Sequence, residues 1–540
     1  MRELRDPGPS VAEFTAKAVG AGLLFGVLFG AANAYLGLKA GLTVSTSIPI
    51  AVLSAALFRS LGGGTILEAN LAQTVGSASS SLASGTIFTI PALFMWGLAP
   101  PVTQVALLAL FGGVLGILAM VPLRRLLIVQ ADAELPYPEG RACAEVLRAT
   151  ERGSAGGAWI FLGLALGAVV KLALSAAHLL PDEVGTGIGP LPNANLSIKV
   201  APALLAVGFI VGFRAASVMV AGGLVSAVVL VPLVTKVHAS AGAEALTAAA
   251  VRSGFVVYVG AGAVAAAALV TIARTAPTMA RSLAAILRGL RMGAGGPAGE
   301  RTDRDLPARA LLAGVGLLVL ALGAVPGLFA GNLSFAARVL AALGVAAFGF
   351  VFVPVSSRLV GLIGVSSNPT SAMALITMAG TSAAFLAFGW GGLDARAAVL
   401  TVGTVVCVAA SKAGDISQDL KTGWMVGATP ARQQFGQLIA AAVACWAVAA
   451  VVVAIGHGPE GFGEGGMPAP QARLMKTVVD AVLGETLPWD LLGMGGALAL
   501  VGALAGLPAL PFALGIYLPL STMAAVFAGG LVRRIAGEGG

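Results

Sequence analysis

The chain has 540 residues, of which 58% are hydrophobic and only 10% are charged, and its mean hydropathy is +0.94. This composition excludes an ordinary soluble globular protein and indicates a polytopic membrane protein. The formal net charge of +8 does not indicate nucleic-acid binding, because the positive residues are spread over a few connections beside apolar runs.

Apolar runs follow one another along the whole chain. A hydrocarbon core of about 30 Å requires about 20 apolar residues per helix, and the sequence offers about fifteen such runs separated by short polar connections. We therefore predict an all-α polytopic integral membrane protein. Three scattered cysteines and three histidines without metal-ligand spacing predict no disulfide framework, no metal site and no cofactor.

The N-terminal segment 1–19 indicates the orientation of the chain. Arg2, Arg5 and Lys17 precede the first long apolar stretch, and positive residues concentrate in the cytoplasmic connections of membrane proteins. We therefore expect the N-terminus in the cytoplasm and the protein in the plasma (inner) membrane. The segment shows no small-residue cleavage pattern, so a removed signal peptide is not expected.

The end of the first span and the segment after it are rich in polar side chains. A lysine and a run of hydroxyls could meet the carboxylate of a peptide or chelate, a group that cations and helix N-termini both attract. The alternative is a lysine that simply lies at the outer membrane surface. The candidates are Asn33, Tyr35 and Lys39, followed by the hydroxyls of Thr43, Ser45, Thr46 and Ser47.

The third apolar run, residues 67–97, is as hydrophobic as a membrane span but contains amides, hydroxyls, glycines and Glu68. Polar groups at membrane depth are tolerated only where they are buried in protein or line a wet cavity. Glu68 is a candidate for reversible protonation, because an ionisable group at this depth is costly and tends to titrate near neutral pH. The alternative is that Glu68 lies near the cytoplasmic interface and caps a helix.

Other polar side chains of the third run recur at spacings of three and four, so they share one helical face. Such a face lines a substrate pathway or packs closely against other membrane helices, and the sequence leaves both interpretations open. The candidates are Asn70, Gln73, Ser77, Ser80, Ser81, Ser84 and Thr86.

Two features predict a chain of two homologous halves. The basic, glycine-rich segment 276–306 reads as a cytoplasmic linker between an N-terminal transmembrane half, 1–275, and a C-terminal one, 307–540. The segments that start at Ala206 and Ala513 align without gaps at an offset of 307 residues, which pairs Gly208 with Gly515. A looser match of 75–85 with 363–373 predicts a broken or re-entrant polar segment in each half.

The sequence NPTS, which starts at Asn368, places a proline in an apolar context. Proline frees backbone carbonyls and favours a broken helix, whose loose polar groups need partners. A substrate could be that partner, with Asn368, Thr370 and Ser371 as candidates, but an ordinary kink satisfied by neighbouring hydroxyls is equally compatible.

The segment 414–423, GDISQDLKTG, follows the apolar run 397–410. Because its charges are dense, we expect it at the cytoplasmic rim, as a solvated loop, a gate or a dimer contact. The candidates are Asp415, Gln418, Asp419 and Lys421.

Four long segments, in order, resemble the oligopeptide transporter family, which includes the yellow stripe-like metal-chelate carriers. They start at Ala31 (ANAYLGLKAGLTV), Thr65 (TILEANLAQTVGSASSS), Asn368 (NPTS) and Gly414 (GDISQDLKTGWMV), and the resemblance extends from about Phe14 to Arg534. It implies about sixteen spans, uptake of peptides, modified peptides or metal chelates driven by protons, and homodimers, which some members form. Many members have an acidic residue where this chain has Ser80.

Together these features predict a proton-coupled secondary transporter that imports small peptides or peptide-like chelates by alternating access, with about 15–16 transmembrane helices. The expected partners are the small-molecule substrate, protons and the lipid bilayer. No enzyme signature occurs, because neither a phosphate-binding glycine loop ending in GK[ST] nor a nucleophile elbow in strand context is present. The alternatives are an integral membrane enzyme, such as a lipid or glycan transferase, and a passive solute channel.

Overall fold

The computed structural model describes residues 11–151, 181–273, 301–484 and 488–537, together with a few residues between 162 and 173. Short gaps fall at 41–42, 44, 182, 241–245, 265, 268, 271–272, 366–367, 369, 464–465 and 468. Most of the predicted linker, residues 276–300, lies outside the described residues.

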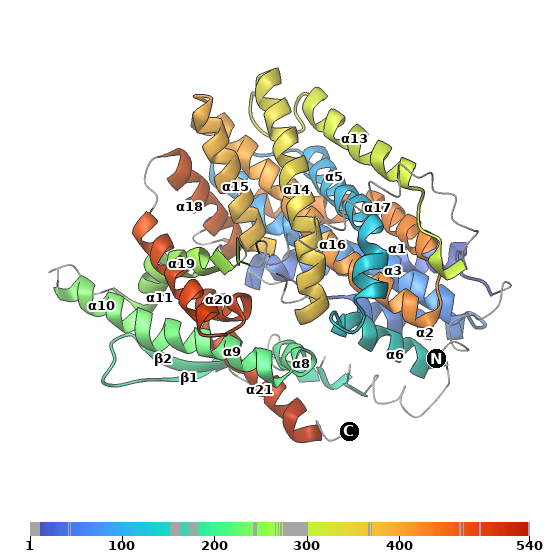
Figure 1. Cartoon of the computed structure of the whole chain (residues 1–540), viewed down its shortest axis with the longest axis horizontal. Coiled ribbons are helices and arrows are strands. Elements are labelled where there is room, and N and C mark those ends of the chain that lie inside the picture. Colours follow the sequence, from blue (N-terminus) through green and yellow to red (C-terminus); the bar gives the residue numbers. More distant parts are fainter. Residues whose placement is uncertain are drawn as a thin grey trace. The chain divides into compact units, whose positions relative to one another are not determined.

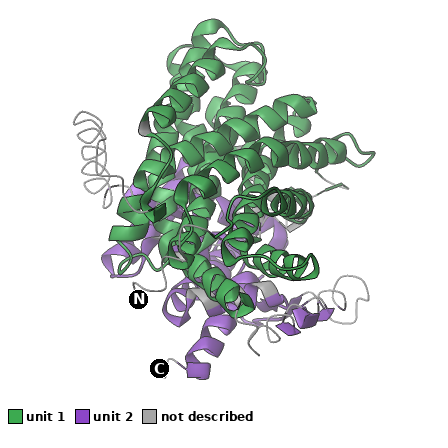
Figure 2. Cartoon of the chain, turned by 90° about the vertical axis from the view of Figure 1, so that its right-hand side faces the viewer, with its two compact units in different colours: residues 1–157, 276–487 green, residues 158–275, 488–540 purple. Residues whose placement is uncertain are grey.

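The described chain is almost entirely helical, and it divides into two compact units (Figures 1 and 2). Unit 1 comprises residues 1–157 and 276–487, and unit 2 comprises residues 158–275 and 488–540. The predicted halves therefore do not coincide with the compact units. Each half contributes its first part to unit 1 and its last part to unit 2.

Unit 1 contains the long helices. They are α1 (Ala16–Ala40), α2 (Ser47–Ser60), α3 (Ile66–Thr89), α4 (Pro91–Met95), α5 (Val102–Met120), α6 (Pro138–Glu151), α13 (Ala308–Ala324), α14 (Phe335–Ile363), α15 (Thr370–Ala387), α16 (Gly392–Val426), α17 (Pro430–Gly456) and α18 (Pro470–Leu483). Short 3-10 and π-helical turns occupy Val121–Leu123, Arg125–Gln130 and Arg301–Asp303.

Unit 2 has shorter elements. They are the strands β1 (Glu183–Gly187) and β2 (Asn195–Lys199) and the helices α8 (Pro202–Val211), α9 (Phe213–Leu224), α10 (Val231–Ser240), α11 (Ala248–Val251), α19 (Trp489–Leu504), α20 (Ala509–Tyr517) and α21 (Leu520–Gly537), with π-helical turns at Val225–Leu230 and Arg252–Val256. The two strands form an antiparallel hairpin in which Val184 faces Ile198, a local element that the sequence analysis did not predict.

Seven helical segments among the described residues are long and apolar enough to cross a membrane by length and composition. They are Ala16–Leu38, Ile66–Met95, Val102–Leu123, Phe213–Ser240, Phe335–Leu362, Gly392–Val426 and Pro430–Gly456. Shorter apolar helices, such as α2 and α19, accompany them, as expected where spans are broken or re-entrant. The prediction of an all-α polytopic membrane protein is confirmed.

Two helices form the core of unit 1. Every residue of α3 from Leu67 to Thr89 is buried, and α16 is buried from Ala397 to Gly423. Figure 1 shows α3 in blue and α16 in orange among α1, α5, α14 and α17, and all four contact one or both core helices. A helix that is buried all round cannot solvate its polar side chains with water, so these side chains must find partners inside unit 1.

The tighter of the two predicted repeats has a structural counterpart in unit 2. At an offset of 307 residues, the first residues of α8 and α9 correspond to the first residues of α20 and α21. The packing is reciprocal, since α8 contacts α21 while α9 contacts α20. A Cβ on Gly208 would meet the Val526 carbonyl, and a Cβ on Gly515 would meet the carbonyl of Met219, the residue that corresponds to Val526.

The looser predicted match has no such counterpart. Residues 75–85 lie within the continuous helix α3, whereas 363–373 covers the end of α14, a connection and the start of α15. The two segments therefore differ in secondary structure, since 75–85 stays helical while Gly364 (φ +84°) ends α14, and their equivalence as repeats stays a prediction.

The reciprocal packing predicts that unit 2 loses a similar amount of stability when either of two glycines far apart in the sequence is replaced by alanine. Gly515→Ala and Gly208→Ala should each destabilise unit 2 by about 1 to 3 kcal/mol, because the added methyl group collides with a backbone carbonyl. Gly493→Ala in α19 is the matched control, since nothing lies within 4 Å of its Cβ position. Thermal unfolding in detergent measures the effect. Stability equal to that of the control at either position would contradict the reciprocal packing.

Candidate functional site

Buried charged residues of α16 lie at the centre of unit 1. Lys412, Asp415 and Asp419 are 0%, 5% and 0% exposed, and they share one helical face because they stand at i, i+3 and i+7. The expectation of a solvated loop at 414–423 is therefore wrong, since Gln418 and Lys421 are buried as well, while the gate and dimer-contact alternatives stay predictions. The charges are dense there because neighbouring helices supply polar partners.

Asp419 accepts hydrogen bonds from uncharged donors on three other helices. Gln73 Nε2 of α3 lies 2.5 Å from Oδ1, and Ser77 Oγ of α3 lies 2.8 Å from Oδ2. Gln437 Nε2 of α17 lies 2.5 Å from Oδ2, and Ser47 Oγ of α2 lies 3.4 Å from Oδ1. Four dipoles thus replace the water that an exposed carboxylate would bind, and Asp419 ties α2, α3 and α17 to α16.

Asp415 is less completely bonded than Asp419. Its Oδ2 atom is buried and has no hydrogen-bond partner. The charged groups that act on it are Lys412 and Asp419 of α16 and Glu139 of α6. Lys412 donates to the Ala78 carbonyl of α3 at 3.4 Å. The site thus contains a cation and a carboxylate whose hydrogen-bonding capacity is only partly used.

Two glutamines of α17 belong to the same cluster, and the sequence analysis did not select them. Gln433 Nε2 donates to Thr74 Oγ1 at 3.0 Å and to the Asp419 carbonyl at 2.9 Å, and Gln437 Nε2 also donates to the Thr74 carbonyl. These acceptors fix the orientation of both amides, which leaves both side-chain oxygens buried without a hydrogen-bond partner. The sequence did contain a signal for them, since two glutamines four residues apart on an apolar helix lie on the same face.

The predicted polar face of α3 divides into two parts. Gln73 and Ser77 bind Asp419, whereas Ser80 pairs with Thr46 at 2.7 Å and Ser84 with Ser411 at 2.5 Å. Ser81 and Thr86 donate to carbonyls of their own helix, and Asn70 donates to Gln73 at 3.4 Å while its Oδ1 atom has no partner. Most of this face therefore holds α3 to its neighbouring helices or bonds within α3. Gln73 and Ser77 belong to the charged cluster formed around Lys412, Asp415 and Asp419 of α16.

The NPTS segment reaches the same cluster. Asn368 lies in the connection between α14 and α15 and donates to Ser356 Oγ at 2.8 Å, while its Oδ1 atom has no partner. Its Nδ2 atom is only 3.0 Å from the Cβ position of Gly414, so the missing side chain at 414 admits the amide. Thr370 begins α15 and is buried, and Ser371 follows it half-buried.

The candidates at the end of α1 do not form a single group. Asn33 is buried, whereas the Tyr35 side chain is 47% exposed and therefore does not line the buried cluster. Lys39 belongs to the last turn of α1, and the placement of its side chain lies outside the described part of the chain. Ser47 is the member of the following hydroxyl run that contacts Asp419.

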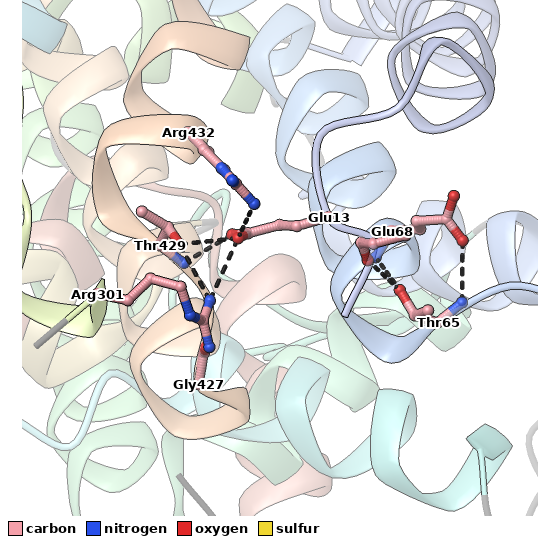
Figure 3. A network of polar contacts seen from close by, with 8 residues as sticks. Glu13, Thr65, Glu68, Arg301, Gly427, Thr429 and Arg432 are labelled. Atoms are coloured by element: carbon pink, nitrogen blue, oxygen red, sulfur yellow. Dashed lines mark hydrogen bonds and ion pairs between the residues drawn. The ribbon is translucent and has the colours of Figure 1, made fainter. Parts of the chain in front are cut away.

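Glu68 forms a capping box at the start of α3. The Thr65 side chain accepts from the Glu68 backbone N–H at 3.0 Å, and Glu68 accepts from the Thr65 N–H at 3.0 Å (Figure 3). Thr15 donates to the same carboxylate at 2.7 Å, and Lys17 forms an ion pair with it at 3.1 Å. These contacts fit the capping alternative, so we transfer the coupling hypothesis from Glu68 to the buried carboxylates of α16.

Figure 3 also shows a polar network that secures the segment before α1. Glu13 is buried, accepts from the Thr429 backbone N–H at 2.6 Å and pairs with Arg301 at 3.3 Å and Arg432 at 2.9 Å. Arg301 also donates to the Gly427 carbonyl at 2.9 Å. The turn between α16 and α17 is thereby joined to the described end of the predicted linker and to the segment before α1.

The other end of the charged segment packs on α6. Gln418 accepts from the Gly140 N–H at 2.6 Å and donates to the Val360 carbonyl at 3.0 Å. Lys421 pairs with Asp132 and lies 4.5 Å from the centre of the Trp424 ring. Both residues thus hold the C-terminal part of α16 against its neighbours.

The described residues contain no group of three or more His, Cys, Asp or Glu side chains that could hold a metal ion. Buried charges on membrane-length helices, bonded to amides and hydroxyls of neighbouring spans, are typical of membrane transport proteins. A family model described as OPT oligopeptide transporter protein matches residues 13–536. The chain is also 31% identical over 549 residues to a Haemophilus influenzae protein described as "Putative oligopeptide transporter", covering 93% of this chain and 85% of that protein.

The chain therefore belongs to the OPT oligopeptide transporter family, as the resemblance in the sequence analysis implied.

Proposed function

We propose that the chain imports small peptides, modified peptides or peptide-like metal chelates by proton-coupled alternating access. The protein would reside in the plasma (inner) membrane with its N-terminus in the cytoplasm. The family supports the peptide substrate class. The observation that carries the coupling is the difference between the two buried carboxylates of α16, since Asp419 is fully bonded while Asp415 Oδ2 has no hydrogen-bond partner.

A carboxylate with an unused oxygen can gain a proton without losing a hydrogen bond. Protonation of Asp415 would remove a buried negative charge that acts on Asp419, Glu139 and Lys412. Each charge that crosses the membrane releases about 2.3 kcal/mol per 100 mV of potential, which suffices to concentrate a solute. Asp415 is therefore our proposed coupling group, and Asp419 the residue that fixes its surroundings.

Asp415→Asn tests this assignment. Wild-type protein in proteoliposomes should accumulate a labelled peptide against its gradient when an inward proton gradient is imposed, and an uncoupler should abolish the accumulation. The variant should exchange internal for external peptide but lose accumulation, which is about tenfold for each pH unit of driving force. Asp394→Asn, an exposed aspartate on the same helix, is the matched control and should accumulate like the wild type.

Three outcomes would count against the proposal. Proton-driven accumulation by Asp415→Asn at the wild-type level would remove Asp415 from coupling. Equilibration of solute without accumulation by the wild type would favour the passive channel, and recovery of a chemically altered solute would favour the membrane enzyme. A panel of peptides and metal chelates in the same vesicles would identify the substrate class.

A further inference from the structure

The helix α18 packs on the two core helices of unit 1 but is too short to cross a membrane. It contacts α3 and α16, and also α4 and α15 (Figure 1). Its 14 residues reach only about 21 Å, less than a hydrocarbon core of about 30 Å. Ala472, Met475 and Val479 are buried at i, i+3 and i+7, so one face of α18 lies against the rest of unit 1. The helix therefore covers the core helices without running their full length.

Hydrogen bonds locate the end of the core that α18 covers. They join α3 and α16 at successive levels, which are Ser77–Asp419 at 2.8 Å, Ser84–Ser411 at 2.5 Å and Thr89–Thr404 at 2.8 Å. The two helices are therefore antiparallel, and the contacts of α18 with Trp96 and Arg396 lie beyond the last of these levels. Thr429, which Glu13 binds, lies beyond the other end of α16. The helix α18 thus covers the end opposite the N-terminal segment, and the charged cluster lies between the two ends.

One carboxylate of α18 fastens this helix to its neighbours. Asp480 accepts a hydrogen bond from Arg396 Nη1 of α16 at 2.7 Å and another from Trp96 Nε1, directly after α4, at 3.1 Å. Lys476, one turn earlier in α18, donates to the same carboxylate at 2.7 Å. The side chains of Asp480 and Arg396 are 27% and 30% exposed, and ion pairs in contact with water contribute little and break readily. Asp480, Arg396 and Trp96 therefore form a reversible latch, in contrast to the buried contacts of Asp419.

The residue before α18 has a strained backbone. Ala469 adopts φ +37° and ψ +55°, the left-handed region that residues with a Cβ atom avoid. Its N–H donates to the Leu38 carbonyl near the end of α1 at 2.9 Å, and its side chain is buried. Strain of this kind persists only where the surrounding contacts impose it. Rotation of α18 about Ala469 would therefore release strain once the latch opens.

We infer that α18 is a gate over the end of unit 1 opposite the N-terminal segment, held shut by the latch and pivoting at Ala469. Its opening would expose the hydroxyl-bearing contact between α3 and α16, which leads from Thr89 and Thr404 toward the charged cluster. The inference rests on the proposed alternating access and deepens it, because it names the element that moves at one end. The network around Glu13 secures the other end through a separate set of contacts.

Thiol labelling in lipid nanodiscs, where both membrane faces are accessible, tests whether the latch holds α18 shut. Val479→Cys places a reporter of similar volume on the buried face of α18, and the three native cysteines are buried as well. A polar maleimide should therefore label this protein slowly. Adding Asp480→Asn should accelerate labelling roughly three- to tenfold, the factor expected for losing a partly exposed ion pair and a charge-assisted hydrogen bond.

Two controls separate an opening of α18 from general loosening. Glu134→Gln, which breaks an exposed ion pair elsewhere in unit 1, should leave the labelling rate of the reporter unchanged. Asp480→Asn without the reporter should stay as slowly labelled as the wild type, because the native cysteines remain buried when only α18 moves.

A reversible cross-link tests whether the movement is required for transport. In the double variant Arg396→Cys with Asp480→Cys, a short bifunctional thiosulfonate joins α16 to α18 through two disulfides that a reductant cleaves. The cross-linked protein should lose exchange of a labelled dipeptide in proteoliposomes, and reduction should restore the exchange. Asp480→Cys alone, treated with the same reagent, is the matched control and should keep exchanging.

Two results would overturn the gate. A reporter labelled no faster with Asp480→Asn than with Glu134→Gln would show that the latch does not hold α18, and undiminished exchange by the cross-linked protein would show that α18 need not move. The proposed transport would stand in both cases as long as the wild type exchanges the dipeptide. Failure of the wild type to exchange any peptide or chelate would overturn the proposed function, while the labelling rates would still decide whether α18 opens.

Discussion

Asp419→Ala is expected to destabilise unit 1 by about 3 to 5 kcal/mol, more than any other single change in the charged cluster. The substitution removes the acceptor that Gln73, Ser77 and Gln437 share, and each buried donor left without a partner costs about 1 to 3 kcal/mol. Ser77 and Gln437 keep the Thr74 carbonyl as a second acceptor. Removing a buried charge offsets part of this loss. The donors come from two other helices, however, so the contacts between α3, α16 and α17 weaken together.

Thermal unfolding in detergent, followed by the fraction of protein that remains monodisperse, measures this loss. Asp394→Asn, at an exposed aspartate near the start of the same helix, is the comparison, because its side-chain oxygen can still accept from the Asn332 N–H, and it should unfold near the wild-type temperature. Ser77→Ala removes one of the four donors and should cost about 1 kcal/mol. An Asp419→Ala variant as stable as Ser77→Ala would show that Asp419 does not hold these helices together.

The membrane class and the importance of α3 could be predicted from the sequence because both depend on local composition. A run as apolar as 67–97 has to be buried in lipid or protein, and its amides and hydroxyls exclude lipid. Which residues meet these amides could not be predicted locally. Gln73 and Asp419 are 346 positions apart in the sequence, and only tertiary packing brings them together.

The position of 414–423 was misjudged for a related reason. Dense charge usually indicates solvent, and the sequence alone does not state that α6 and α17 supply the polar partners. One local signal was present, since Lys412, Asp415 and Asp419 share a helical face at i, i+3 and i+7 directly after an apolar run. A segment with this spacing reads better as a continued helix than as a loop.

Glu68 illustrates the opposite case. The capping alternative could be stated from the sequence because Thr65 and Glu68 have the spacing of a capping box. The further partners Thr15 and Lys17 come from the start of α1, and they show why this carboxylate is bound on several sides. The sequence shows that Glu68 is an acidic residue at the start of an apolar run. It does not show whether Glu68 or Asp415 is the better candidate for proton coupling, because remote helices set the environment of Asp415.

Asp132→Asn is expected to weaken the C-terminal end of α16 in a pH-dependent manner. Lys421 is fully buried, and Asp132 supplies a balancing carboxylate. Burial alone would raise the pKa of Asp132, but the hydrogen bond and charge of Lys421, together with Arg141, outweigh burial and lower that pKa. A lowered pKa in the folded state means that the pair contributes its full stability above the unfolded-state pKa of about 3.9 and loses it as pH falls through the folded-state pKa.

The difference in stability between wild type and Asp132→Asn should therefore be constant from pH 7 to about pH 5 and shrink progressively below about pH 4. We expect about 2 kcal/mol at neutral pH, less than for a fully buried pair because Asp132 is partly exposed. Subtracting the stability of the variant from that of the wild type cancels the contributions of the other carboxylates, which titrate in both proteins. Glu134→Gln, which alters an exposed pair with Arg358, should differ little from wild type throughout. A difference for Asp132→Asn that stays constant down to pH 3 would mean that the loss comes from packing and not from the charge on Asp132.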